Sequence, residues 1–295
     1  MAATQTTLPY TGKEFLASLD DGREVWIYGE RVKNITAHPA FQNCARMIAR
    51  LYDALHDDHQ AGRNVLTMPT DWGGFTHRYF RAPTTVDEQV AARDAIAAWW
   101  RPGLLPFMLG GDHTATVPVI EVLAPAFPDL RILQLDAHPD TREEFMGERY
   151  NYASAMARVM DVVPAERVYQ VGMRTGSREE FEHRRPHFFP AHEGHPLDVV
   201  RGLLPELRGH PLYVTIDVDV LDPSEAPGTG SPEPGGLRVP ELIEIVRLLT
   251  DCRVIGGDLV EVAHAWDPTG RTGIAASWII REALLGWWGD PGRCV

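Results

Sequence analysis

The hydrophobic pattern of the chain changes near residue 104. From there on, short continuous apolar runs alternate with stretches in which apolar residues recur every three or four positions. The continuous runs predict buried strands, and the periodic stretches predict amphipathic helices. The expected strands are residues 104–110, 130–136, 167–173, 211–218 and 253–261, and the expected helices are residues 113–127, 152–163, 197–207, 239–250 and 272–288. This alternation is typical of a three-layer α/β/α domain, in which helices cover both faces of a mainly parallel sheet.

The first hundred residues have a mostly helical pattern instead. The predicted elements are a short helix at residues 11–22, a hairpin at residues 23–32 and longer helices at residues 38–59 and 86–100. We therefore expect two domains, a mostly helical segment at residues 1–100 and an α/β domain at residues 101–295.

Acidic residues and histidines follow three of the predicted strands. The candidates are His113 in GGDHT, Asp136, His138 and Asp140 in DAHPD, and Asp217 and Asp219 in DVDVLDP. The carboxyl ends of parallel strands meet at one edge of a sheet, so these side chains can converge. Four carboxylates and two imidazoles without cysteine favour an oxygen-preferring cation such as Mn²⁺ over structural zinc. Two divalent cations would balance the repulsion among the carboxylates and would lower the pKa of a water between them.

A simpler interpretation exists for each of these motifs, because aspartates at strand ends also cap helices. One such motif alone would favour capping. Three motifs at the ends of three strands favour a metal site.

Composition and charge narrow the classes of function. With 28 basic and 41 acidic residues the formal net charge is −13, which disfavours nucleic acid and anionic membranes as partners and suits a small cationic substrate. Cys44, Cys252 and Cys294 are far apart in the sequence, as expected of reduced thiols in a cytoplasmic protein. We expect no signal peptide and no membrane span, since no apolar run approaches the roughly 20 residues that a span requires.

Residues 104–288 resemble the ureohydrolase family, the arginase and agmatinase group. GGDHT, DAHPD and DVDVLDP match its three metal motifs, and PGTGSPEPGG at residues 227–236 matches the loop that follows them. QVGMRTGSREEF and GDLVEVAHAWDPTGRTGIAAS are closer to agmatinase-like members than to arginases. The resemblance implies that the six candidates ligate two Mn²⁺ ions, and that the protein is a homo-oligomer.

Further roles follow from the same resemblance. Glu261 matches the glutamate that grips the substrate guanidinium, and a carboxylate can accept two parallel N–H donors from that planar group. Asp140 is the expected proton carrier to the leaving amine, so Asp140 and Glu261 are the catalytic candidates. Asp112 and Asp222 fit supporting roles, orienting a ligand histidine or capping the loop at Pro223.

Tyr152 departs from the family pattern. Agmatinase-like relatives carry a histidine there, within a Tyr-Ser-His-Ala run that shuttles protons or contacts substrate, whereas this chain has Tyr150-Asn151-Tyr152-Ala153. A phenol, with an ordinary pKa of about 10, is a poor proton shuttle at neutral pH. We therefore expect Tyr152 to contact the substrate, with reduced activity or a different substrate as the consequence.

Residues 11–100 are similar to the N-terminal segment of the large component of 4-hydroxyphenylacetate 3-monooxygenase, a flavin-dependent hydroxylase. The similarity includes TGKEFLASLDDGREVWIYGERVKNITAHPAFQNCARMIARLYDALHD and ends near Trp100, before the parts of that family that build the flavin pocket. By itself it does not imply hydroxylase activity.

The expected function is Mn²⁺-dependent hydrolysis of a linear guanidino compound to urea and an amine. Agmatine is the first candidate substrate, and a guanidino acid such as 4-guanidinobutyrate is the second. One alternative is a metal-binding pseudoenzyme or scaffold that has lost turnover. Another is a flavin-linked phenol hydroxylase component, which only residues 11–100 suggest.

Overall fold

The computed structural model describes residues 8–27, 29–63, 66–70, 73–77, 86–183 and 187–289. The chain forms two compact units, Met1–Arg81 and Ala82–Val295. Helix α3 (Val86–Trp99) belongs to the second unit, where it packs against α4 (Thr116–Leu123). The predicted domain boundary at residue 100 stays a prediction.

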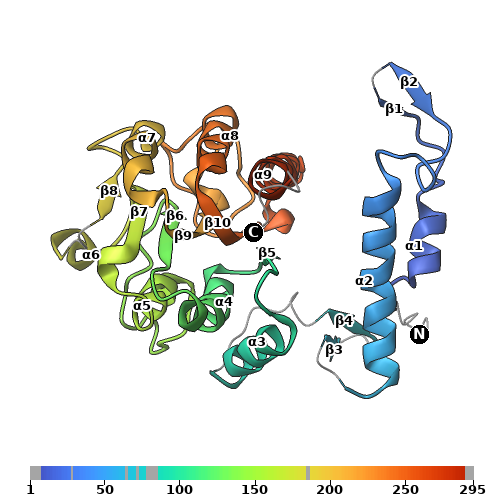
Figure 1. Ribbon diagram of the computed structural model, residues 1–295, viewed down its shortest axis with the longest axis horizontal. Coiled ribbons are helices and arrows are strands. Elements are labelled where there is room, and N and C mark those ends of the chain that lie inside the picture. The colour runs from blue at the N-terminus through green and yellow to red at the C-terminus, as the bar shows by residue number, and fades with distance from the viewer. Residues whose placement is uncertain are drawn as a thin grey trace. The chain divides into compact units, whose positions relative to one another are not determined.

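A six-stranded sheet forms the centre of the second unit (Figure 1). Its strands are β5 (Phe107–Leu109), β6 (Arg131–Leu135), β7 (Val168–Met173), β8 (Phe188–Pro190), β9 (Pro211–Asp217) and β10 (Arg253–Val260). They are ordered β5-β10-β9-β6-β7-β8, and every neighbouring pair is parallel. The prediction of an α/β fold with a mainly parallel sheet is confirmed.

Helices cover both faces of this sheet because successive side chains along each strand point to opposite sides. Leu212 and Val214 of β9 belong to one apolar cluster, together with α7 (Pro196–Leu207), α8 (Val239–Leu248) and α9 (Arg271–Trp288). Tyr213, between them, belongs to a second cluster with α4 and α5 (Ala155–Met160). The three-layer arrangement therefore follows from strands that are apolar on both faces.

The strand order places a switch point between β6 and β9. From β6 the chain continues to β7 and β8 on one side, and β9 and β10 then pair on the other side. Ligands of open α/β sheets bind outside the carboxyl ends of the strands at such a point. This position determines where the site is built.

Several predicted boundaries differ from the structure. The helix expected at residues 113–127 is broken into α4 and the flanking 3-10 turns His113–Ala115 and Ala124–Ala126. The strand expected at residues 253–261 ends at Val260, because Glu261 adopts a left-handed backbone conformation with φ 65°. Short elements were missed: β8, α6 (Arg178–Glu182), β3 (Thr67–Pro69) and β4 (Phe75–His77).

The first unit consists of α1 (Gly12–Ser18), the hairpin of β1 (Val25–Ile27) and β2 (Glu30–Val32), α2 (Gln42–Gln60) and the hairpin β3–β4. Thr11 and Glu14 form a capping box that starts α1. The Gly12 amide donates to Asp53 Oδ1 at 2.7 Å and so ties α1 to α2. Gly12 suits this close approach, since an added Cβ would lie 2.5 Å from the Ala49 carbonyl oxygen.

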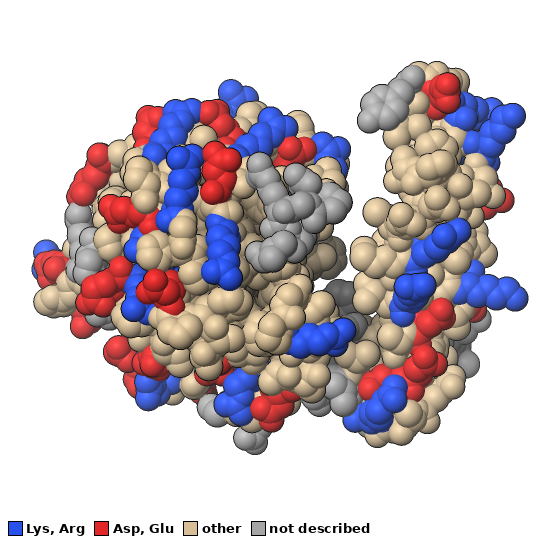
Figure 2. Space-filling model, viewed as in Figure 1, with Lys and Arg blue, Asp and Glu red and all other residues tan. Residues whose placement is uncertain are grey.

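Two surface properties bear on partners. Acidic and basic side chains are interspersed over the face of the second unit seen in Figure 2, so that face presents no single-sign field of the kind that attracts nucleic acid. Within the described residues, no helix combines the length and apolar character needed to cross a bilayer.

Candidate metal centre

The six candidate ligands meet at the carboxyl edge of the sheet. His113 begins the 3-10 turn that follows β5, Asp136, His138 and Asp140 lie in the loop after β6, and Asp217 and Asp219 lie at the end of β9. Five of them form two groups of possible ligands, which we call the inner cluster (His113, Asp136 and Asp140) and the outer cluster (Asp136, His138 and Asp219), and the sixth, Asp217, lies beside the inner cluster. Asp136 belongs to both, as expected of a bridging carboxylate.

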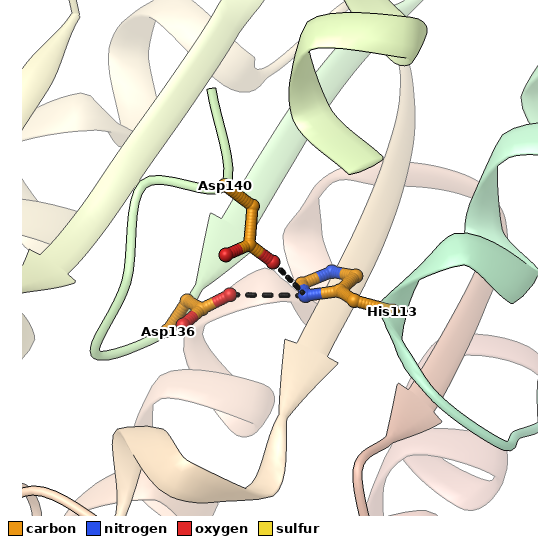
Figure 3. A group of neighbouring side chains, drawn as sticks. All are labelled: His113, Asp136 and Asp140. Carbon is orange, nitrogen blue, oxygen red and sulfur yellow. Dashed lines mark ion pairs between the residues drawn. The ribbon is translucent and has the colours of Figure 1, made fainter. Parts of the chain in front are cut away.

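The side chains of the inner cluster point toward one another (Figure 3), and all three residues are buried. His113 Nδ1 lies 3.0 Å from Asp136 Oδ2, 3.1 Å from Asp140 Oδ2 and 3.5 Å from Asp217 Oδ2. The imidazole is fully buried, yet Nδ1 forms no hydrogen bond. A buried nitrogen that faces three carboxylates without a bond is suited to a shared cation.

The outer cluster lies beside the first and is more open. His138 Nδ1 is 2.8 Å from Asp219 Oδ2 and 3.7 Å from Asp136 Oδ1. The His138 side chain is 19% exposed to solvent, whereas the His113 side chain is 0% exposed. The Ala137 amide donates to Asp219 Oδ1 at 3.0 Å, which ties the loop after β6 to the end of β9.

Electrostatics at the two clusters also favour a cation. Burial raises the pKa of Asp140 to about 7, and Asp136 adds to that shift. Burial works to lower the pKa of His113, but the surrounding carboxylates raise it well above its ordinary value. The site therefore attracts positive charge, and a divalent cation at Nδ1 would take the place of a proton. Oxygen and imidazole donors fit an oxygen-preferring divalent metal.

Backbone geometry holds the loop after β6 in place. Asp140 has φ 53°, a left-handed conformation that is uncommon for a residue other than glycine. Its carbonyl accepts the amides of Met156 and Ala157 at 2.9 and 3.1 Å, which satisfies the start of α5. Strain of this kind costs about 1–3 kcal/mol and concentrates at functional sites.

Two buried glutamines support Asp136. Gln134 and Gln170 face each other across β6 and β7, and Gln170 Nε2 donates to Gln134 Oε1 at 2.7 Å. Gln134 Nε2 in turn donates to Asp136 Oδ2 at 2.7 Å and to the His138 carbonyl at 3.1 Å. The orientation of the shared carboxylate is thus fixed from inside the sheet.

Glu261 follows β10 and reaches the inner cluster. Its Oε1 accepts the backbone amide of His113 at 2.8 Å, and burial raises its pKa to about 7. Glu261 also lines a cavity of about 470 Å³ together with His138, Asp140, Asp217 and Asp219. This cavity is large enough for a small linear molecule.

An aromatic and charged wall completes the cavity. Tyr152 remains 44% exposed and packs its ring against Phe145, with centroids 5.8 Å apart. The Arg142 guanidinium lies 4.7 Å from the Phe145 ring and 3.6 Å from Glu180. Tyr152 is therefore placed to contact a ligand in the cavity, and its predicted role stays a prediction.

Both predicted supporting residues accept backbone amides. Asp112 accepts the Thr114 amide at 3.0 Å and caps the 3-10 turn that carries His113. Asp222 accepts the amides of Ser224 and Gly235, both at 2.9 Å, and closes the loop that follows β9. Neither contact reaches a candidate ligand side chain, so a role in orienting one stays a prediction.

Sequence reasoning missed Arg174, Thr215 and Asp258. Arg174 donates to the carbonyls of Leu221 and Glu233 at 3.3 and 2.9 Å, and so fastens the loop that lines the cavity beside the outer cluster. Thr215 lies two residues before Asp217 on the same side of β9, and Asp258 is a charged residue inside an otherwise apolar strand. These two signals could have been read from the sequence.

Comparisons with known proteins agree with this geometry. The model of the arginase family matches residues 45–286. The agmatinase of Bacillus anthracis is 41% identical over 187 residues, which are 63% of this chain and 64% of that protein. The guanidinobutyrase of Pseudomonas aeruginosa is 33% identical over 192 residues, 62% of this chain and 60% of that protein. The matched stretch thus spans less than two thirds of either relative.

A solved structure and a third relative complete the comparison. The crystal structure of a putative agmatinase from Clostridium difficile has a TM-score of 0.64 and 31% identity, over 70% of this chain and 76% of that one. The oxygenase component of the 4-nitrophenol 2-monooxygenase of Rhodococcus sp is 56% identical over 95 residues, 32% of this chain but 18% of that protein. The predicted resemblance of a separate segment to a monooxygenase is confirmed.

Proposed function

The chain belongs to the arginase family, and from that premise we propose that it hydrolyses a small linear guanidino compound to urea and an amine. The observation that carries the proposal is Asp136, which joins two clusters of metal-ligand type directly beside a cavity that Glu261 lines. The names of the matched relatives, agmatinase and guanidinobutyrase, support the same chemistry.

The metal part of the proposal is a pair of Mn²⁺ ions. His113, Asp136, Asp140 and Asp217 would hold one ion, and Asp136, His138 and Asp219 would hold the other. When bound, such ions activate a water molecule and stabilise negative charge in the transition state. The unpartnered Nδ1 of His113 and the preponderance of carboxylate oxygens support this assignment.

Glu261 is the residue proposed to hold the guanidinium group. A carboxylate offers about four lone-pair sites. The His113 amide takes one of them, so sites remain for two parallel N–H donors from a guanidinium in the cavity. Holding the planar group in this way fixes its carbon above the two clusters.

Asp140 is the proposed proton carrier to the leaving amine. It lies in the inner cluster and also lines the cavity, so its carboxylate adjoins both the ligand cluster and the substrate space. General acid–base transfer by a positioned group of this kind contributes typically about 10²–10⁴-fold to a rate.

The substrate candidates are agmatine and, second, a guanidino acid such as 4-guanidinobutyrate. A formal charge of −13 and the acidic residues Glu180 and Glu233 in the cavity wall support a cationic ligand. A cytoplasmic location and assembly into a homo-oligomer are further parts of the proposal.

A substrate panel tests the proposal. Purified protein supplied with Mn²⁺ should release urea from agmatine or a guanidino acid, measured by a colorimetric urea assay. Protein that binds the metal but releases urea from no member of the panel would refute the proposed hydrolase.

Tyr152 keeps one alternative open, a metal-binding scaffold without turnover. In that case Tyr152→His would bind metal unchanged and remain inactive. For a weakened hydrolase we expect Tyr152→His to raise kcat on agmatine by up to about 10²-fold, since an imidazole transfers protons at neutral pH. Tyr152→Phe is the control, because it keeps the ring packing on Phe145 and adds no proton carrier.

A further inference from the structure

A buried row of polar side chains lies directly behind His113. The imidazole Nε2 is 2.9 Å from Thr215 Oγ1, and the hydroxyls of Thr215 and Thr116 are 3.3 Å apart. Thr116 Oγ1 donates to Asp258 Oδ2 at 2.9 Å. Tyr213 donates its hydroxyl to the same oxygen at 2.8 Å. All five residues are buried, and the row joins β9, β10 and the first turn of α4 to the inner cluster.

The number of protons available along this row determines which group donates in each of its hydrogen bonds. An ionised carboxylate only accepts hydrogen bonds, and each hydroxyl has one proton to give. Because the Thr116 hydroxyl donates its proton to Asp258, Thr215 must be the donor in the hydrogen bond between the two threonine hydroxyls. Thr215 then has only lone pairs left for His113, so the proton of that bond belongs to Nε2.

The consequence appears on the other side of the imidazole. In neutral histidine one ring nitrogen carries the proton and the other is an acceptor. When a cation displaces the proton from Nδ1, the proton held on Nε2 leaves the lone pair on Nδ1, the atom that faces Asp136, Asp140 and Asp217. The row therefore presents the nitrogen in the form that binds a cation.

Core stability alone does not account for Asp258. Burying a carboxylate costs several kcal/mol, and an apolar residue of similar volume is often as stable or more so. Asp258 is fully buried, and its Oδ1 has no partner. Burial raises its pKa, while the hydrogen bonds that Tyr213 and Thr116 donate to it act in the opposite direction and favour the ionised form. A group kept in so unfavourable a place has a role other than packing.

We propose that Asp258 is a positioning residue that acts through Thr116 and Thr215 to hold the His113 proton on Nε2 and leave Nδ1 free for a divalent cation. The inference rests on the proposed metal site. It does not require that the protein hydrolyse a guanidino compound.

The test measures Mn²⁺ binding without substrate, by the electron paramagnetic resonance signal of free Mn²⁺ in a titration of the full chain. Removal of a residue behind a metal ligand typically weakens binding about 10- to 100-fold. We expect this loss in Asp258→Leu and in Thr215→Val, for one of the two bound ions only. Because both substitutions interrupt the same row, the double variant should lose no more Mn²⁺ affinity than the single variant that binds Mn²⁺ more weakly.

Three matched variants separate this role from general loosening of the core. Thr215→Ser keeps the hydroxyl, and Asp258→Asn keeps an oxygen that can accept from Thr116, so both should bind Mn²⁺ nearly as the wild type does. Tyr213→Phe removes the other donor to Asp258 without interrupting the row. It should lower the melting temperature of the metal-free protein and leave Mn²⁺ affinity close to that of the wild type.

The outcomes are distinct. The proposal would be overturned by wild-type Mn²⁺ affinity in Thr215→Val or by additive losses of Mn²⁺ affinity in the double variant. It would also be overturned if Tyr213→Phe lost as much Mn²⁺ affinity as Asp258→Leu. A wild-type protein that binds Mn²⁺ and releases no urea, with the expected pattern among the variants, would refute the hydrolase and leave the role of Asp258 standing. A wild-type protein that binds no divalent cation would overturn both.

Discussion

The inner and outer clusters share Asp136 but are built differently. His113 is fully buried and is held from behind by residues of α4, β9 and β10. His138 is partly exposed, lines the cavity and has Nε2 3.9 Å from Glu233. The inner histidine is thus held by residues of the sheet and of α4, whereas the outer histidine adjoins the cavity and the loop that carries Glu233.

This difference has consequences for exchange and for stability. Asp140 of the inner cluster lines the cavity, but His113 and Asp136 are fully buried, so an ion held by them should exchange slowly. A set beside a cavity exchanges with solvent directly. We therefore expect the outer ion to leave first when a chelator is added. We also expect substitutions in the inner cluster to lower Mn²⁺ affinity and melting temperature more than substitutions in the outer cluster do.

The shared carboxylate should give the largest effect. Asp136→Asn removes charge from both clusters at once, so both ions should bind weakly and the difference between the clusters should disappear. Loss of metal assistance is worth several kcal/mol, which corresponds to a fall in urea release of about 10³-fold or more. Metal analysis and a urea assay measure the two losses. Asp129→Asn, at an exposed site, is the control, and retention of both ions by Asp136→Asn would contradict the shared role.

Histidine variants should separate the clusters. His113→Ala should weaken Mn²⁺ binding by more than the roughly 100-fold seen for residues behind a ligand, and it should also lower the melting temperature, because it empties a fully buried site. His138→Ala should lose one ion and keep the other, with little change in melting temperature. Equal metal loss and equal destabilisation in the two variants would contradict the difference in construction.

A Glu261 variant separates substrate binding from metal binding. Glu261 contacts the inner cluster through the His113 amide, but it is not one of the proposed metal ligands. Glu261→Gln keeps an acceptor for that amide and loses the charge that pairs with a guanidinium. Charged hydrogen bonds contribute about 1.5–3 kcal/mol, so kcat/KM should fall about 10- to 150-fold with two ions still bound. A fall in metal content of the same size would assign Glu261 to the metal centre instead.

Asp222 should give the smallest effect, confined to the loop beside the outer cluster. Hydrogen bonds from Ser224 and Gly235 hold its pKa at about 2, below the ordinary 3.8. The stabilisation is therefore complete above the ordinary value and is lost as the pH falls toward 2. Because the group is largely solvated, the contribution is about 1 kcal/mol or less.

Thermal unfolding between pH 5 and pH 2 measures this contribution, in the wild type and in Asp222→Asn. In metal-free protein the variant should be slightly less stable at pH 5 and should lose less stability on acidification than the wild type. An unchanged pH profile would show that Asp222 does not carry the dependence.

The sequence contained most of the sheet and the meeting of the candidate ligands. Continuous apolar runs marked β5, β6, β7, β9 and β10, and the acidic residues and histidines after β5, β6 and β9 pointed to one edge because parallel strands share a direction. The short strand β8 and helix α6 were missed, since three to five residues carry too little periodicity.

The row behind His113 could not be predicted in the same way. Thr116, Thr215 and Asp258 are far apart in the chain, and they meet only because β10 lies between β5 and β9. Hydrophobic patterns predict that strands form, but they do not give the order of those strands. The left-handed conformations of Asp140 and Glu261 were hidden for a related reason, because contacts from distant segments, such as the Met156 amide on the Asp140 carbonyl, hold them.

The most direct test of a centre joined by Asp136 is the electron paramagnetic resonance spectrum of the chain saturated with Mn²⁺, together with its metal content. Our account predicts two ions per chain and the multiline spectrum of an exchange-coupled pair, which Asp136→Asn abolishes. A single ion per chain, or two ions with the spectrum of isolated Mn²⁺, would contradict it.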